Sequence, residues 1–140
     1  MFCRIAASGG TSPDNGVVWR GRECFAVLNA YPYASGHLLV LPVRHVGELD
    51  GLSTTESAEL WQGTRGAATT VRRAYDPDGM NIGINLGRAA GAGVPGHLHV
   101  HIVPRWSGDT NFMTSVGDVR VMPEPLEKAW HRLAGEWPPD

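Results

Sequence analysis

The sequence predicts an α+β domain built on an antiparallel sheet, and three observations lead to this expectation. The 140 residues suit a single domain with a hydrophobic core of its own. The strand-like and helix-like segments follow the order strands, helix, strands, helix, without the regular alternation typical of parallel sheets. No internal repeat and no apolar run of membrane-spanning length interrupts this pattern. We therefore expect one domain over residues 1–140.

Two apolar segments in the first third of the chain predict neighbouring strands. Residues 23–32 (ECFAVLNAYP) have the composition of a buried strand, and residues 36–45 (GHLLVLPVRH) that of the next one. A proline lies at or near the end of each segment and few residues separate them, so we expect a hairpin-like connection. Residues 8–16, rich in Gly, Ser and Asn, are expected to form a loop.

The middle of the chain predicts a helix over residues 54–75. Ser53 and Glu56 have the spacing of a capping box, in which each side chain binds the other residue's backbone N–H. Apolar residues then recur on one helical face, at Leu60, Ala67, Ala68, Val71 and Tyr75. The sequence Pro77-Asp78-Gly79 should end the helix.

Four further segments complete the expected order of elements. Residues 80–87 (MNIGINLG) alternate in part and predict a strand, and residues 88–96 (RAAGAGVPG) predict a glycine-rich loop. Residues 97–104 (HLHVHIVP) predict the clearest strand of the chain. Apolar residues at helical spacing then predict a C-terminal helix over about residues 125–137, with Pro125 in its first turn.

The strand at residues 97–104 contains three of the six histidines of the chain, at alternate positions. His97, His99 and His101 would line one face of a strand, with the apolar residues between them on the other. Packing alone explains this poorly, because three buried imidazoles each need hydrogen-bond partners. One metal ion cannot easily bind all three, since a strand rises about 13 Å over four residues. Two of them could still bind one ion, so a catalytic metal stays open as an alternative.

Chemistry by imidazole is the third explanation, and the neighbouring residues favour it. Imidazole is a competent nucleophile near neutral pH and can carry a phosphoryl or nucleotidyl group. The glycine-rich loop could bring backbone N–H groups close to an anion. Arg88 and Arg105 bracket the histidines in sequence. The central histidine could act as the nucleophile, and the histidines on either side could stabilise charge or orient it.

The run HLHVHIV, residues 97–103, resembles the signature of the histidine-triad (HIT) superfamily. Residues 27–45 are similar to the first hairpin of that family, including Asn29 and His37, and NIGINLGRAAGAG resembles the strand and turn before the triad. The resemblance extends over about residues 20–113. It implies the HIT-like α+β fold, with an antiparallel sheet of about five strands and two main helices. It also implies a homodimer, with a tetramer as a further option.

The resemblance assigns roles to single residues. His99 would be the nucleophile that forms a nucleotidyl-histidine intermediate, and His97, His101 and His37 would complete the catalytic cluster around the phosphate. Substrate contacts are expected from Asn29 at the ribose, Asn85 beside the phosphates, and Gly91, Gly93, Arg105 and Trp106. This chemistry requires no metal or other cofactor.

The segment HIVPRWSGDTNFM, residues 101–113, resembles the branch of the family that cleaves diadenosine polyphosphates, particularly bacterial hydrolases and phosphorylases of diadenosine tetraphosphate. We therefore expect a nucleotidyl hydrolase or transferase that acts at an α-phosphorus. A purine nucleoside phosphoramidase of the same fold is one alternative, and a nucleotide-binding or scaffold protein with vestigial catalysis is another. A substrate pocket, or a loop packed by its own aromatic rings, is expected from Trp106, Asp109, Asn111 and Phe112.

The chain departs from the family pattern in two places. Residues 93–96 (GVPG) lack the Ser, Thr or Gln that many relatives place before the triad, so backbone N–H groups, histidines or another side chain must assist the leaving group. Many bacterial members also begin with CxxC, which joins two histidines in a structural zinc site. Here Cys3, His45 and His97 would remain. Three ligands rarely close such a site, so we expect no zinc.

Charge and targeting signals narrow the expected partners. A net charge of −2 argues against nucleic acid and anionic membranes as general partners, because both attract basic surfaces. The start of the chain is unlike a signal peptide, and Cys3 and Cys24 form no disulfide framework. We expect a cytoplasmic protein whose partner is an adenine nucleotide substrate, either a dinucleoside polyphosphate or an AMP derivative.

Overall fold

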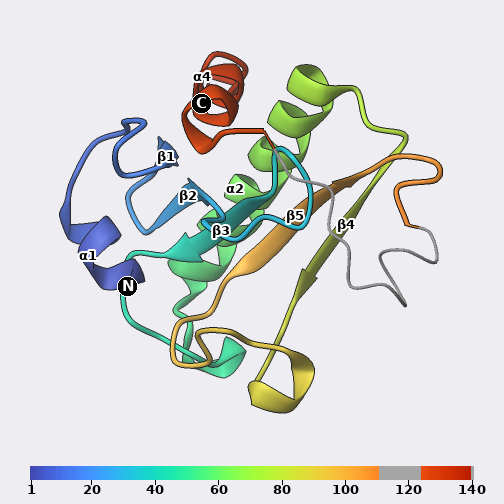
Figure 1. Cartoon of the computed structure of the whole chain (residues 1–140). Helices are drawn as coiled ribbons and strands as arrows, with labels where there is room; N and C mark the ends of the chain where they lie inside the picture. Colours follow the sequence, from blue (N-terminus) through green and yellow to red (C-terminus); the bar gives the residue numbers. More distant parts are fainter. Residues whose placement is uncertain (111–123, 140) are drawn as a thin grey trace.

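A five-stranded antiparallel sheet organises residues 1–110 and 124–139, which the computed structural model describes (Figure 1). The strands lie in the order β1-β2-β3-β5-β4, and every neighbouring pair is antiparallel. Their bounds are β1 (Val17–Arg20), β2 (Cys24–Leu28), β3 (Leu38–Pro42), β4 (Gly79–Ile84) and β5 (Val100–Arg105). The predicted α+β class and antiparallel sheet are confirmed.

Two main helices cover one face of this sheet. α2 (Thr54–Tyr75) packs on β2, β3 and β5, and α4 (Leu126–Ala134) packs on β1 and contacts α2 (Figure 1). A short helix, α1 (Phe2–Ala7), packs against the other face. Two short 3-10 turns, η1 (Leu49–Gly51) and η2 (Arg88–Ala90), lie in the connections before α2 and before β5.

The central strands β2 and β3 are buried on both faces, because the sheet separates two apolar clusters. Successive residues of β2 point to opposite faces: Ala26 and Leu28 join α2 and α4, whereas Phe25 and Val27 meet Phe2 of α1. A strand covered on both faces contains a continuous apolar run instead of an alternating one. This explains why residues 23–32 were recognisable as a buried strand.

The bounds of α2 match the predicted helix. Ser53 Oγ accepts the Glu56 N–H at 3.1 Å, and the Glu56 carboxylate accepts the Ser53 N–H at 2.7 Å, so the predicted capping box is present. At the other end Asp76 adopts a left-handed conformation with φ of 45°. This residue redirects the chain ahead of Pro77, and the helix ends there.

Several other elements differ from their predicted bounds. The C-terminal helix α4 ends at Ala134, because Trp137 leaves the helical path and stacks on Trp19 with ring centroids 5.1 Å apart. The predicted strands over 23–32, 36–45 and 80–87 are longer than β2, β3 and β4, since their ends belong to turns. Neither α1 nor β1 was predicted, and both are short elements.

The histidine-bearing strand also begins later than the predicted residue 97. β5 starts at Val100, which pairs with Val40 of β3. Before it, the His97 N–H closes a turn onto the Val94 carbonyl, and the Leu98 N–H binds the Val46 carbonyl beyond β3. These bonds replace regular strand pairing. His101 therefore lies in β5, whereas His97 and His99 lie in the segment that leads into it.

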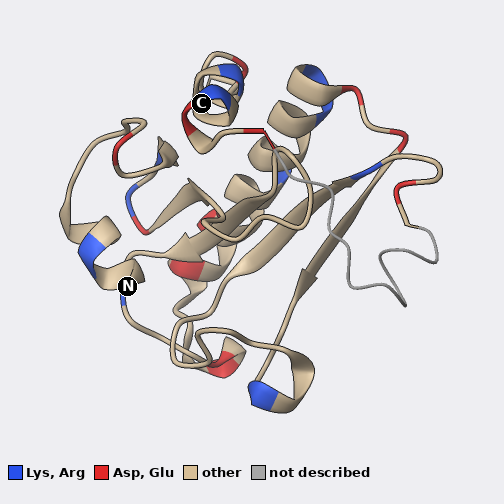
Figure 2. Ribbon diagram, viewed as in Figure 1, with Lys and Arg blue, Asp and Glu red and all other residues tan. Residues whose placement is uncertain are grey.

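Acidic and basic side chains are interspersed along the ribbon, and neither sign dominates the view (Figure 2). This distribution agrees with the net charge of −2. Among the described residues, no helix is both long and apolar enough to cross a membrane.

Candidate active site

Three of the predicted catalytic histidines, His37, His101 and His99, form one row of neighbouring rings, and the carbonyl oxygen of the fourth, His97, lies 2.7 Å from His99 Nδ1. His37 lies directly before β3, and its ring centroid is 5.2 Å from that of His101. The ring of His101 is in turn 4.9 Å from the ring of His99. Phe2 of α1 covers the far end of the row, with its ring 5.5 Å from both His97 and His99. No pattern in the sequence predicted this position of Phe2.

The predicted division between a histidine face and an apolar face is also present. Leu98, Val100 and Ile102 are 3%, 5% and 0% exposed and belong to the core beneath α2. His97 and His99 are themselves 1% and 6% exposed. Buried imidazoles need hydrogen-bond partners. Those partners determine which ring nitrogen of each histidine carries the proton.

A backbone carbonyl orients His99. Its Nδ1 lies 2.7 Å from the His97 carbonyl oxygen, which can only accept a hydrogen bond. The Nδ1 atom must therefore carry the proton, and Nε2 keeps its lone pair in the neutral ring. His99 is thus held in the tautomer that a nucleophile at Nε2 requires.

A second chain of bonds orients His37 and His101. The Tyr33 backbone N–H donates to His37 Nδ1 at 3.1 Å, so the proton of the neutral His37 ring is on Nε2. His37 Nε2 then donates to His101 Nδ1, 2.9 Å away. His101 must consequently carry its own proton on Nε2, the nitrogen that is left for a substrate. The ring of Tyr33 also stacks on that of His101, at 6.0 Å.

Burial disfavours the charged form of His37 and of His101. Burial, followed by the effects of the neighbouring His101 and His99, lowers the pKa of His37 to about 3. Burial, followed by the effect of His99, also lowers the pKa of His101. Asn29 lies at the same place, with its side-chain nitrogen 3.3 Å from His37 Nδ1. The predicted ribose ligand is therefore adjacent to the histidine row.

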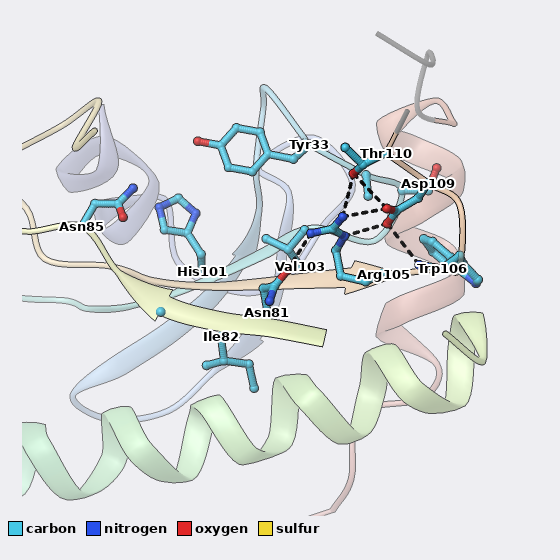
Figure 3. A pocket seen from close by; sticks show the side chains of 13 residues that line it. Tyr33, Asn81, Ile82, Asn85, His101, Val103, Arg105, Trp106, Asp109 and Thr110 are labelled. Atoms are coloured by element: carbon cyan, nitrogen blue, oxygen red, sulfur yellow. Dashed lines mark hydrogen bonds and ion pairs between the residues drawn. The ribbon is translucent and has the colours of Figure 1, made fainter. Parts of the chain in front are cut away.

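A cavity of about 650 Å³ opens beside His101 (Figure 3). His101 and Asn85 lie at one end and Arg105 and Trp106 toward the other, with Tyr33 above them. Its volume is in the range of small-molecule sites. The predicted substrate residues Asn85, Arg105 and Trp106 all line it.

Arg105 is bound by other residues of the protein. Its Nε and Nη2 atoms each donate to the Asp109 carboxylate at 2.6 Å, and its Nη1 donates to Asn81 Oδ1 at 2.8 Å. The guanidinium lowers the pKa of Asp109, and the Trp106 backbone N–H adds to this effect. Arg105 therefore brings little free positive charge to the cavity. Asp109 was predicted to shape a pocket; Asn111 and Phe112 lie outside the described residues.

The two predicted loop glycines lie outside the cavity lining. Gly91 has φ of +90°, and a Cβ on it would lie 3.7 Å from Asn85 Nδ2. It therefore allows the loop to turn beside Asn85. A Cβ on Gly93 would meet no atom of the described residues within 4 Å. The structure gives no contact that explains a substrate role for Gly93.

Cys3, His45 and His97 do come together. Their ligand atoms lie within 4.8 Å of one another, and Cys3 Sγ is 3.3 Å from His45 Nδ1. His97 donates from Nε2 to the Pro42 carbonyl at 2.8 Å, which leaves the lone pair of Nδ1 facing this group. The donors are of the kind that zinc prefers, but the group in the described residues is one ligand short of a closed structural site.

Fold and site together define a small α+β protein with a row of alternating histidines beside an open cavity, the architecture of a histidine-triad protein. The family model described as "HIT domain" matches residues 11–108, and the chain belongs to this family.

Named relatives and solved structures are similar to this chain. The "AP-4-A phosphorylase" of Mycobacterium tuberculosis is 49% identical over 121 residues, which cover 86% of this chain and 62% of that protein. The "Bis(5'-nucleosyl)-tetraphosphatase [asymmetrical]" of Schizosaccharomyces pombe is 37% identical over 66% of this chain and 50% of that protein. A "ZN-bound histidine triad family protein" from Mycobacterium smegmatis superimposes with a TM-score of 0.76, at 27% identity over 96% of this chain and 90% of that one. The chain thus spans only part of the two curated relatives.

Proposed function

We propose that this protein is a nucleotidyl hydrolase or transferase that cleaves dinucleoside polyphosphates such as diadenosine tetraphosphate. The observation that carries the proposal is the orientation of His99, whose Nδ1 proton is bound to a backbone carbonyl, so that Nε2 keeps the lone pair that a nucleophile needs. The names of the M. tuberculosis and S. pombe relatives support the substrate class. The 49% identity to the M. tuberculosis protein extends over 86% of this chain and supports the same substrate class.

The first chemical step is attack of His99 Nε2 on an α-phosphorus. A P–N bond forms, the bond from phosphorus to the bridging oxygen breaks, and the remaining nucleoside polyphosphate leaves with the electron pair. His101 supports this step because its Nε2–H can donate to an oxygen of the phosphate chain as negative charge develops. It takes the place of the Ser, Thr or Gln that residues 93–96 lack.

In the second step an acceptor oxygen attacks the same phosphorus and displaces His99 Nε2. Water would release AMP, whereas inorganic phosphate would release ADP. Asn29 would hold the ribose of the transferred nucleotide, and Asn85 beside Gly91 the phosphates. No metal is assigned a role in these steps. Free Cys3 and Cys24 suit the reducing cytoplasm, where we place this reaction.

Product analysis with isotopically labelled phosphate tests the proposal. We expect diadenosine tetraphosphate to yield ATP with either unlabelled AMP or labelled ADP, and the second product identifies the acceptor as water or phosphate. The reaction should persist after treatment with a zinc chelator, since the steps above use imidazoles alone. Absence of turnover with every adenylylated substrate tested would reject the proposal.

We also propose that the protein forms a homodimer through the free edge of β4. β4 pairs with β5 on one side, and its other edge has no strand partner in the described part of the chain. Ile82 of β4 lies across from Ile102, on the face that α2 covers, yet Ile82 is 45% exposed and Ile102 is 0% exposed. A second copy joined edge to edge would extend the sheet and cover Ile82.

Replacing Ile82 with lysine should convert the dimer into a monomer, because it places a charge in the apolar part of the interface. Size-exclusion chromatography with light scattering measures the change. Leu49→Lys is the matched control, since Leu49 is similarly exposed (47%) and lies in η1, away from β4. A wild-type protein that is monomeric at micromolar concentration would contradict this proposal.

A further inference from the structure

We infer that the cavity beside His101 binds the second nucleoside of the substrate, the one that departs with the leaving group. The phosphate chain would occupy the end formed by His101 and Asn85, and the base and ribose the end formed by Arg105 and Trp106. This inference rests on the proposed function and adds a subsite to it.

The position of the cavity relative to the nucleophile supports this assignment. His101 lines the cavity, but His99, 4.9 Å away between ring centroids, does not. Asn29, the proposed ribose ligand of the transferred nucleotide, lies beside His37 and does not line it either. We therefore place the transferred nucleotide at His99 and Asn29, and a group that extends from the phosphorus past His101 would enter the cavity.

The length of the cavity suits a chain of phosphates followed by a nucleoside. His101 and Arg105 lie at opposite ends of the part of β5 that lines it. Four residues of strand separate their Cα atoms by about 13 Å. With a volume of about 650 Å³, the cavity is large enough for a nucleotide-sized ligand.

The charges at the Arg105 end favour a neutral group over a phosphate. Arg105 donates four hydrogen bonds, two to Asp109 and one each to Asn81 and Thr110. A phosphate placed here would meet the Asp109 carboxylate, and the guanidinium is already paired with it. A nucleoside has no such conflict.

The remaining groups at this end are those that recognise a base and a sugar. Trp106 offers an aromatic surface for stacking, and Asn81 offers an amide. The Asp109 carboxylate accepts the Trp106 N–H at 3.1 Å, so the ion pair also fixes the backbone that carries the indole. Arg105 is therefore a positioning residue: it holds Asp109, and Asp109 holds the backbone of Trp106, which lines the subsite.

Substrate selectivity tests the inference. The kcat/KM of the Trp106→Leu variant is measured for diadenosine tetraphosphate and for the p-nitrophenyl ester of AMP, which has the same transferred group but a leaving group without a nucleoside. The ratio of the two values should fall about tenfold to a hundredfold, because stacking acts on the first substrate alone. Trp106→Phe should recover most of the ratio, and Leu49→Ala, outside the cavity, should not alter it.

The remaining results of these kinetic measurements separate failure of the subsite from failure of the proposed function. An equal loss on both substrates, or a ratio like that of the wild type, would overturn the second-nucleoside subsite. Cleavage of the AMP ester by a wild-type protein that ignores diadenosine tetraphosphate would reject the proposed substrate, and lack of both activities would reject the proposed function.

The Arg105–Asp109 pair provides an independent test by a double-mutant cycle. If the pair orders the wall, Asp109→Asn and Arg105→Gln should each raise the KM for diadenosine tetraphosphate by similar factors, and the double variant should be no worse than either. If Arg105 instead binds phosphate, Asp109→Asn should lower the KM, because it frees the guanidinium. That second result would overturn the inference.

Discussion

Replacing His99 with asparagine should lower kcat for diadenosine tetraphosphate on the order of 10⁴-fold or more, the scale expected when a covalent nucleophile is removed. Asparagine can still donate a hydrogen bond to the His97 carbonyl, so the local structure should persist. It has no basic lone pair at the position of Nε2. The variant should therefore bind nucleotide while failing to form the adduct.

The decisive measurement is a single-turnover experiment that is quenched and analysed by mass spectrometry. The wild type should gain the mass of one adenylyl group on His99, and His99→Asn should gain none. His131→Asn is the matched control, because it makes the same substitution at an exposed position on α4. If His99→Asn kept activity within tenfold of the wild type, His99 would not be the nucleophile. If the wild type itself lacked activity but bound nucleotide, the alternative of a binding protein would gain support.

The second large effect is on stability. Replacing Glu56 with alanine should lower the free energy of unfolding by about 2 to 3 kcal/mol, the range for loss of charge-assisted hydrogen bonds and a helix cap. Glu56 is 3% exposed and joins two elements. Its carboxylate receives Arg44 Nε at 2.8 Å and Arg44 Nη2 at 2.7 Å, as well as the Ser53 N–H. One residue thus caps α2 and ties the segment after β3 to it.

The pH dependence identifies the charge as the cause. Arg44, followed by the Ser53 N–H, lowers the pKa of Glu56 from 4.5 to about 2. A lowered pKa in the folded state stabilises the protein fully above pH 4.5, and this contribution is lost as the pH falls from 4.5 toward 2. The difference in unfolding free energy between wild type and Glu56→Gln should shrink over this interval. Urea titrations at several pH values measure it, with the exposed Glu136→Gln as control. A difference independent of pH would contradict the explanation.

The parts of the fold that follow local rules were predictable. The limits of α2 follow from the capping box at Ser53 and the turn signal at Pro77, both written in adjacent residues. β1 was missed because its four residues follow a polar loop and gain their burial from β2 and from α4, distant in sequence. α1 was missed because its six residues are too few for a periodic signal.

The sequence predicted which histidines come together, but not the hydrogen bonds that orient them. Alternation along residues 97–102 predicted which side chains face the core, even though β5 begins only at Val100. The protonated nitrogen of each ring depends on partners remote in sequence, such as the Pro42 carbonyl at His97 and the Tyr33 N–H at His37. The sequence pattern predicted Arg105 as a substrate contact and did not predict its ion pair with Asp109.

Four histidine side chains carry their protons on different ring nitrogens, and backbone atoms decide the position of the proton for three of them. The Tyr33 N–H fixes His37 and through it His101, the His97 carbonyl fixes His99, and the Pro42 carbonyl fixes His97. Side-chain replacement leaves carbonyls in place, and it leaves N–H groups in place unless proline is introduced. The proton positions on His37, His97 and His99 are therefore insensitive to most substitutions in the residues around them, so the residues that line the cavity can change without moving these protons.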